Sequence, residues 1–154
     1  MKTMTQPKTI STARRIFVSL GATVLASTLL STQVQAQPAA VKNKIVFQVS
    51  DNDPVKWSLA LNNAQNVQAD LGADTVDQEI VVYGPGISML KTDSPVAQRI
   101  ASAMKNGVKV VACEVTLKAQ KLTHADMLPD IGYVPAGVVE LMKKQQQGYA
   151  YIRP

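Results

Sequence analysis

Short apolar runs and longer amphipathic stretches alternate along this sequence from residue 44 to its last residues. The short runs are rich in β-branched and aromatic residues, and each is closed by polar residues or glycine, a pattern typical of β-strands. They predict five strands, of which the fourth is the shortest and weakest: 44–50, 78–83, 108–112, 130–134 and 149–152.

The stretches between these runs carry apolar residues every three or four positions, which predicts helices. The clearest begins at Asp53-Pro54, carries an apolar stripe from Trp57 to Leu71 and ends at Gly72. Further helical segments are expected around 87–90, from Ser94-Pro95 to Gly107, over 114–119, as a capped turn from Thr123 to Asp126, and from Pro135 to Gly148 with Val138, Val139, Leu141 and Met142 on its inner face.

A strand followed by a helix, repeated four times and closed by a last strand, determines the expected fold class. Strands joined by helical crossovers form a mainly parallel sheet with helices on both faces. We therefore expect an α/β protein, a three-layer α/β/α sandwich with a mainly parallel five-stranded sheet. We expect it to form a single domain over residues 44–154.

The first 36 residues have the pattern of an export signal. A basic segment containing Arg14-Arg15 precedes a weakly apolar run, and Val34-Gln35-Ala36 is a small-x-small cleavage site. The arginine pair favours the twin-arginine route, with general export as the alternative. Residues 37–43 are expected to form a flexible leader. A periplasmic product with no stable membrane insertion after cleavage is expected, and an uncleaved signal that acts as an anchor stays open.

The charge distribution argues against a nucleic-acid-binding role. The formal net charge is +5, but four of the 16 basic residues lie in the predicted signal and all 11 acidic residues follow it, so the mature chain carries +1. A nearly neutral domain lacks the basic surface that binds phosphate backbones. No nucleic-acid partner is therefore expected.

Three strand ends are predicted to lie side by side at the carboxyl edge of the sheet, where ligands of open α/β sheets bind. They carry residues 50–53, 83–86 and 113–114. We take Cys113 as the candidate catalytic residue, and as candidate ligand-binding residues Asp51, Asn52, Tyr83, Gly84, Gly86 and Glu114. The alternatives stay open: Asp51 and Asn52 suit a turn, glycines serve turns, and a free cysteine is often a buried packing residue.

Cys113 is the only cysteine and His124 the only histidine. At the start of the helix over 114–119, a thiolate would be stabilised by backbone N–H groups, with Lys118 and Lys121 adding to this effect and Glu114 opposing it. His124 could act as a base for Cys113 or be an exposed helix residue. A lone histidine does not make a metal site, so no metal and no cofactor are expected.

The chain resembles the DsrE/DsrF-like sulfur-relay family, which has the YchN-like fold. The resemblance rests on the opening strand Lys44–Ser50, the segment Gly107-Val108-Lys109-Val110-Val111-Ala112-Cys113 and the closing segment Gln147–Pro154. In that family the cysteine after the third strand accepts sulfane sulfur as a persulfide and passes it on. The resemblance implies this role for Cys113, a homotrimer or homohexamer, and a sulfur donor or acceptor protein as partner.

Two other functions remain possible at this stage. The chain can be a non-catalytic periplasmic module that binds a small ligand or assembles with a partner, with Cys113 as a structural residue. A thiol redox role ranks last, because the chain has no second cysteine to resolve an internal disulfide.

Overall fold

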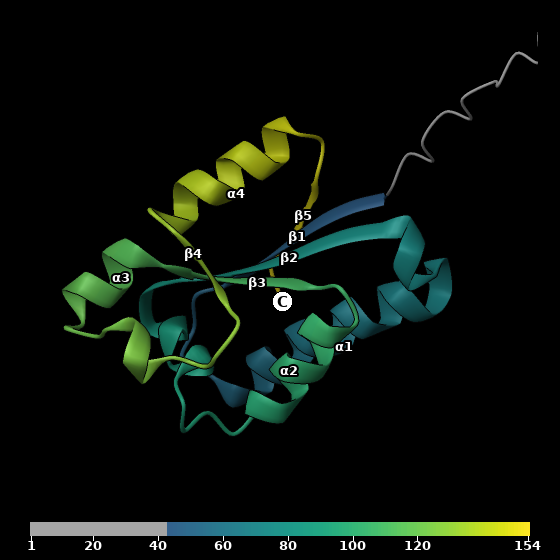
Figure 1. The fold of residues 1–154 in the computed structure, drawn as a ribbon. Helices are drawn as coiled ribbons and strands as arrows, with labels where there is room; N and C mark the ends of the chain where they lie inside the picture. Colours follow the sequence, from purple (N-terminus) through teal and green to yellow (C-terminus); the bar gives the residue numbers. More distant parts are fainter. Residues whose placement is uncertain (1–42) are drawn as a thin grey trace, which may run out of the picture. The chain divides into compact units, whose positions relative to one another are not determined.

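A single parallel sheet forms the centre of the computed structural model, which describes residues 43–154 (Figure 1). Its strands run in the order β4-β3-β2-β1-β5, and every neighbouring pair is parallel. The bounds are β1 (Asn43–Val49), β2 (Val76–Val82), β3 (Lys109–Cys113), β4 (Gly132–Val134) and β5 (Ala150–Ile152). The predicted fold class is confirmed. The predicted signal and residues 37–42 of the leader lie outside the described residues, and Asn43 already pairs with Val76.

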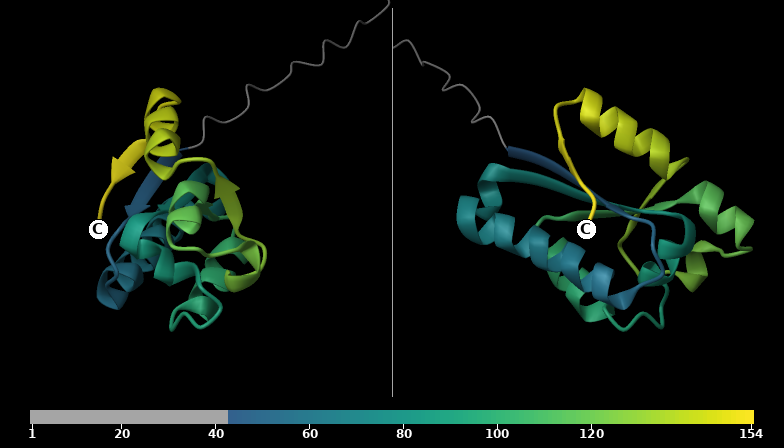
Figure 2. Two further views of the ribbon diagram at one scale, coloured as in Figure 1. Left: turned by 90° about the vertical axis from the view of Figure 1, so that its left-hand side faces the viewer. Right: turned by 180° about the vertical axis from the view of Figure 1, so that it is seen from behind.

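Helices cover the two faces of the sheet unequally, as Figures 1 and 2 show. Helices α1 (Pro54–Leu71) and α2 (Ala97–Lys105) lie on one face, α4 (Gly137–Gln146) lies alone on the other, and α3 (Glu114–Ala119) follows β3 at the edge of the sheet. Within residues 43–154 there are also three short 3₁₀ helices: η1 (Ala73–Thr75), η2 (Gly84–Leu90) and η3 (His124–Asp126).

Strand side chains alternate between these two faces and form two cores. The larger core, on the α1 and α2 face, contains Phe47 and Ile80 together with Trp57 of α1. The smaller one, on the α4 face, contains Val81 and Val111. Cys113 lies two positions after Val111 on the same strand, so its side chain also points to the α4 face.

The start of α1 follows the predicted capping pattern, but its apolar stripe ends early. Asp53 Oδ1 accepts a hydrogen bond of 2.8 Å from the Val55 N–H, and Pro54 is the first helical residue. Burial ends at Ala64, whereas Leu71 is 42 % exposed. Among residues 43–154, Leu71 has no helix to pack against, because α2 is short: it ends next to Gln68, whose Nε2 donates to the carbonyl of Asn106.

Two helices start later than predicted because the backbone carbonyls of residues before them take other hydrogen-bond partners. The Ser94 carbonyl accepts from the Ala97 N–H at 3.1 Å, so α2 begins at Ala97. The Pro135 carbonyl accepts from the Val115 N–H at 3.3 Å, which keeps it outside α4.

The predicted inner face of α4 is wrong, with the exception of Leu141. The residues that α4 buries are Gly137, Leu141 and Lys144, whereas Val138, Val139 and Met142 are 58 %, 39 % and 50 % exposed. Lys144 turns inward because its ammonium group lies 2.5 Å from Glu79 Oε2, on the central strand β2. The helix therefore presents an apolar face to solvent.

The Lys144–Glu79 ion pair is buried, with only 11 % and 4 % of the two side chains exposed. Burial raises the pKa of Glu79 above its ordinary value, and the hydrogen bond from Lys144 opposes this shift. Glu140 adds a second carboxylate 3.7 Å from the Lys144 ammonium group. Tyr149 packs its ring 4.9 Å from the same ammonium group and donates a 2.6 Å hydrogen bond to Asp77.

Replacing Lys144 with methionine should lower the free energy of unfolding by about 3 kcal/mol at pH 7, because it leaves the Glu79 carboxylate buried and unpaired. The pKa of Glu79 rises further in this variant. The loss should therefore be largest above that raised pKa and shrink as the pH falls through it and below the ordinary value for glutamate, where Glu79 becomes protonated in both states. Urea unfolding between pH 4 and pH 8 measures it. Lys143→Met, on the exposed side of the same turn, is the control; a loss independent of pH would contradict this account.

Candidate functional site

Three strand ends meet at the carboxyl edge of the sheet. The register pairs Val49 with Val82 and Val82 with Ala112, so the residues that follow β1 and β2 lie next to the end of β3. This arrangement places Tyr83 beside Cys113, as the parallel topology predicted. The first turn of α4 joins them from above the sheet, because Gly137 packs against Tyr83.

Cys113 is both the last residue of β3 and the N-cap of α3. The residue is 5 % exposed, and its thiol makes no N-cap hydrogen bond in the resting geometry. Burial alone would raise the pKa of the thiol. The hydroxyl of Thr116 and the backbone N–H groups of Gly137, Thr116 and Val115 favour the thiolate, and together they hold the pKa of Cys113 below its ordinary value.

Thr116 and Gly137 complete the surroundings of the sulfur, and neither was among the predicted site residues. The Thr116 oxygen accepts a 2.9 Å hydrogen bond from the Gly84 N–H, which joins this side chain to the turn after β2. Its position three residues after the cysteine was an available signal, because an N-cap side chain faces the third residue of its helix. Gly137 gave no signal, since its contact with β2 depends on how α4 is rotated.

Tyr83 and Gly84 occupy the predicted positions at the site. Burial raises the pKa of Tyr83, and nearby Tyr151 adds to the shift, while a hydrogen bond with Ser50 opposes it. Gly84 adopts φ +55°, a conformation that favours glycine, and its carbonyl accepts a 3.1 Å hydrogen bond from Gln120. Tyr83 is the N-cap of η2 and Gly84 its first residue, so both lie where β2 ends beside β3.

Gly86 and Asp51 have structural partners. A Cβ atom on Gly86 would lie 2.7 Å from the Val49 carbonyl oxygen, so this glycine lets η2 pack against the end of β1. Asp51 accepts from Lys56 at 3.0 Å, which lowers the pKa of its carboxyl group, and its carbonyl accepts from the Trp57 indole at 2.7 Å. Both contacts fit the alternative in which Asp51 stabilises a turn.

Asn52 is exposed, and no hydrogen bond to its side chain is formed among residues 43–154. Glu114 pairs with His124 at 2.8 Å, and the histidine ring stacks on Tyr133 at 3.6 Å between centroids. Tyr133 packs against the core on the α1 and α2 face, whereas Cys113 points to the α4 face. This geometry gives no support to His124 as a base for Cys113.

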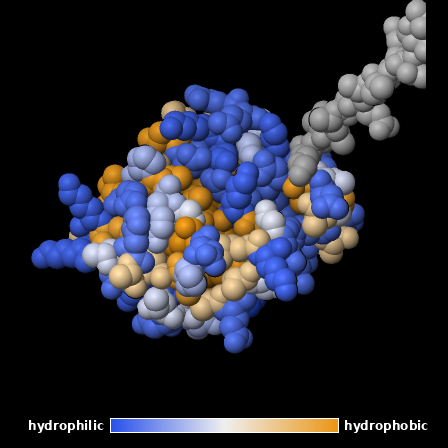
Figure 3. Space-filling model, in the orientation of Figure 1, coloured by the Kyte–Doolittle hydropathy of each residue, from blue (hydrophilic) through white to orange (hydrophobic). Residues whose placement is uncertain are grey.

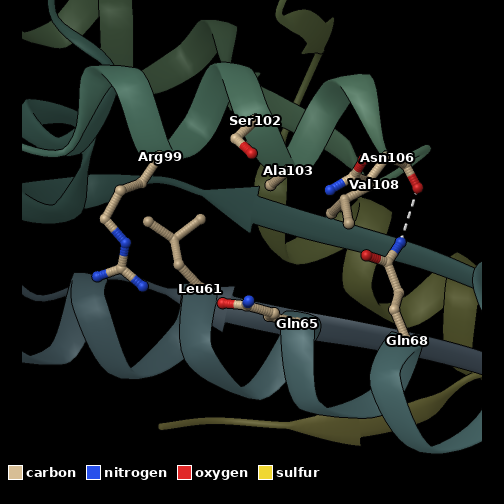
Figure 4. A pocket seen from close by; sticks show the side chains of 8 residues that line it. All are labelled: Leu61, Gln65, Gln68, Arg99, Ser102, Ala103, Asn106 and Val108. Atoms are coloured by element: carbon tan, nitrogen blue, oxygen red, sulfur yellow. Dashed lines mark hydrogen bonds between the residues drawn. The ribbon is translucent and has the colours of Figure 1, made fainter.

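A hollow of the described domain lies on the other side of the sheet from Cys113. It measures about 170 Å³ and lies between α1 and α2, where Gln65, Gln68 and Arg99 line it (Figure 4). Within residues 43–154, no cluster of histidine, cysteine and acidic side chains could hold a metal ion. In the same part of the chain, no helix has the length and apolarity to cross a membrane.

Replacing Gly137 with alanine should loosen the cover over Cys113. The added Cβ would lie 3.0 Å from the Cβ and Cδ1 atoms of Tyr83, so either the ring or the first turn of α4 must move. We expect a loss of about 1–2 kcal/mol in unfolding free energy and faster alkylation of Cys113 by iodoacetamide. Val139→Ala, in the same turn of α4, is the control. Unchanged alkylation of a destabilised Gly137→Ala variant would show that this contact does not limit access.

The comparisons with known proteins agree with this fold. The model of the DsrE/DsrF-like family matches residues 43–154. A solved structure of a protein of unknown function, MTH1491 from Methanobacterium thermoautotrophicum, is 32 % identical with a TM-score of 0.70, over 73 % of this chain and 100 % of that one. No curated protein matched the chain.

Two more distant structures share the fold alone. BT1422, a conserved protein of unknown function from Bacteroides thetaiotaomicron, is 12 % identical with a TM-score of 0.61, over 73 % of this chain and 95 % of that one. The ychN protein from E. coli is 14 % identical with a TM-score of 0.60, over 73 % of this chain and 99 % of that one. With a matching family model over its described residues and this five-stranded parallel sheet, the chain belongs to the DsrE/DsrF-like family.

Proposed function

We propose that this chain transfers sulfur through a persulfide on Cys113. The observation that carries the proposal is the site of this cysteine: a strand end where one hydroxyl and three backbone N–H groups favour the thiolate. The thiolate is the nucleophilic form of cysteine. The family is associated with sulfur relay. The single cysteine of this chain stands at the strand end to which the resemblance assigns that role.

The reaction consists of two exchange steps at sulfur. The Cys113 thiolate attacks the terminal sulfur of a donor persulfide, so that a new S–S bond forms to Cys113 while the donor S–S bond breaks. Its electron pair leaves on the donor thiolate. An acceptor thiolate then attacks the terminal sulfur on Cys113 and releases the Cys113 thiolate. The sulfur atom moves at each step, and no external oxidant or reductant is consumed.

Incubation of the protein with glutathione persulfide should add the mass of one sulfur atom to the wild-type chain. The expected adduct lies on Cys113, because the chain has no other cysteine, and the matched variant Cys113→Ser should remain unmodified. Intact-protein mass spectrometry, before and after addition of dithiothreitol, measures the adduct and its removal. A wild-type chain that gains no sulfur, or an equal gain by Cys113→Ser, would contradict the proposal.

The burial of Cys113 favours a second function, a non-catalytic ligand-binding or assembly module. A residue that is 5 % exposed is poorly placed for reaction unless the first turn of α4 moves. In this case Cys113 packs against the sheet, resists alkylation in the native protein, and tolerates replacement by alanine. The sulfur-uptake experiment separates the two functions.

We place either function in the periplasm, on the basis of the basic segment, apolar run and small-x-small site in residues 1–36. An exported protein would meet sulfur donors and acceptors outside the cytoplasm. The donor and the acceptor are then small thiols or protein thiols of that compartment.

We also propose that the chain assembles into a homotrimer or homohexamer through the exposed apolar face of α4. This face consists of Val138, Val139 and Met142, and Val115 of α3 is 62 % exposed. In Figure 3 hydrophobic residues reach the surface mainly below α4, in the middle of the view, whereas hydrophilic residues cover much of α4 itself. Apolar patches of this kind mark interaction surfaces.

Charged substitutions on α4 should dissociate the assembly. Val138→Asp combined with Met142→Asp places two carboxylates in the proposed interface, where they would have no partner. Light scattering coupled to size-exclusion chromatography should give the mass of a trimer or hexamer for the wild-type protein and of a monomer for this variant. Val55→Asp replaces a more exposed valine on α1, which lies outside this face, and should not change the mass. A monomeric wild-type protein would rule out this interface.

A further inference from the structure

A second hollow of the described domain lies on the flank of α2 that faces away from α1. It measures about 600 Å³, against about 170 Å³ for the hollow between the two helices. Its other wall is the segment that leads into β4, and we call it the α2 groove. The residues that line it are the apolar Ala97, Ala101, Met104, Leu128 and Pro129 and the polar Gln98, Lys105 and Asp130.

Small side chains on α2 create this groove. Ala97 and Ala101 are four residues apart, so they are neighbours on one flank of the helix, and neither side chain extends beyond Cβ. Met104 and Leu128 are partly buried and pack against the larger core. Within residues 43–154 no segment fills the groove, which therefore presents apolar side chains to solvent. Unpartnered apolar surfaces of this kind mark interaction sites.

The apolar face of α4 has the shape that such a groove receives. Its residues Val138, Val139 and Met142 project from a helix, and an amphipathic helix that lays its apolar side chains into a groove is a recurring mode of recognition. Helices α2 and α4 lie on opposite faces of the sheet (Figures 1 and 2). A chain cannot cover its own groove with its own α4, so this contact requires a second copy.

The charges beside the two surfaces favour this contact over pairing of α4 with itself. Lys143 lies next to Met142 on the exposed side of α4, and Asp130 lines the groove. Among residues 43–154, neither of these two side chains forms an ion pair. A two-fold contact between two α4 faces brings the two copies of Lys143 near each other, which costs free energy, whereas the groove offers a carboxylate.

We propose that the α2 groove of one copy of this chain receives the apolar face of α4 from a second copy. The inference rests on the assembly through α4 proposed above, and it names the surface that α4 contacts. The contact joins two different surfaces, so each pair of copies leaves one groove and one α4 face free. Repetition of such a head-to-tail contact closes into a ring, as a trimer requires, whereas a contact of α4 with itself stops at two copies.

This contact links the cysteine sites of neighbouring copies. In one copy, α4 lies over the site, since Gly137 packs against Tyr83 beside Cys113. In the next copy, the segment that forms the wall of the groove leads into β4, where Val134 pairs with Cys113. A movement of α4 over one sulfur is thereby felt at the strand next to the sulfur of the neighbouring copy.

The first test fills the groove. Ala101 is exposed, and Ala101→Glu places a carboxylate among the apolar side chains of the groove, while its position four residues before Lys105 favours the helix. In light scattering coupled to size-exclusion chromatography, the mass should fall from that of the wild-type assembly to that of one chain. Ser102→Glu changes the next residue, which lines the hollow between α1 and α2, and should keep the wild-type mass. An assembled Ala101→Glu protein would overturn the proposal.

The second test traps the contact as a disulfide in a Cys113→Ser background, where each chain carries one introduced cysteine. Copper–phenanthroline oxidation of a mixture of Met142→Cys and Ala101→Cys chains should give a covalent dimer on a non-reducing gel. Neither variant should give one alone, and Ser102→Cys should give none with Met142→Cys. A dimer from Met142→Cys alone, or none in the mixture, would overturn the proposal.

These outcomes distinguish failure of the inference from failure of the proposed function. A dimer from Met142→Cys alone would leave assembly through α4 in place and remove only the groove as its partner. A wild-type protein with the mass of one chain would remove both. Sulfur uptake by Cys113 is measured separately on the wild type, so neither result bears on the sulfur transfer.

Discussion

The rotation of α4 about its own axis is the constraint on which the α4 face of this protein depends. The Lys144–Glu79 ion pair holds one end of the helix on the central strand. Gly137 holds the other end, since its lack of a side chain lets the helix approach Tyr83. Gly137, Leu141 and Lys144 lie on the same side of α4, because 3.6 residues form one turn. In that rotation the Gly137 N–H favours the Cys113 thiolate, and Val138 and Met142 face solvent.

The same rotation explains which parts of the structure were predictable from the sequence. The strand runs, the Asp53 cap and the glycine at position 72 are local signals, and the fold class follows from their order. The inner face of α4 was mispredicted because apolar residues were assigned to the core, although Lys144 has a buried partner on β2. No local pattern reveals that a lysine will pair with a glutamate so far away in the sequence.

In the candidate site, too, the positions set by the parallel topology were predictable, whereas individual side-chain contacts were not. Parallel strands bring their carboxyl ends to one edge, so the neighbourhood of Tyr83, Gly84 and Cys113 was predictable from topology. Glu114 and Asp51 have other partners instead, which the sequence could not show because those contacts involve His124 and Lys56. The pKa of Cys113 results from two opposing effects: burial disfavours the thiolate, whereas the hydrogen-bond donors of α3 and α4 favour it.

The presence of one cysteine in the whole chain has a kinetic consequence. A protein with two neighbouring cysteines can discharge a bound sulfur atom by closing its own disulfide. This chain cannot form such an internal disulfide, and the cover formed by α4 and Tyr83 restricts the access of other molecules to the sulfur. The lifetime of a persulfide on Cys113 would therefore be set by encounters with an outside thiol able to reach beneath α4, which would make the chain a store as well as a carrier.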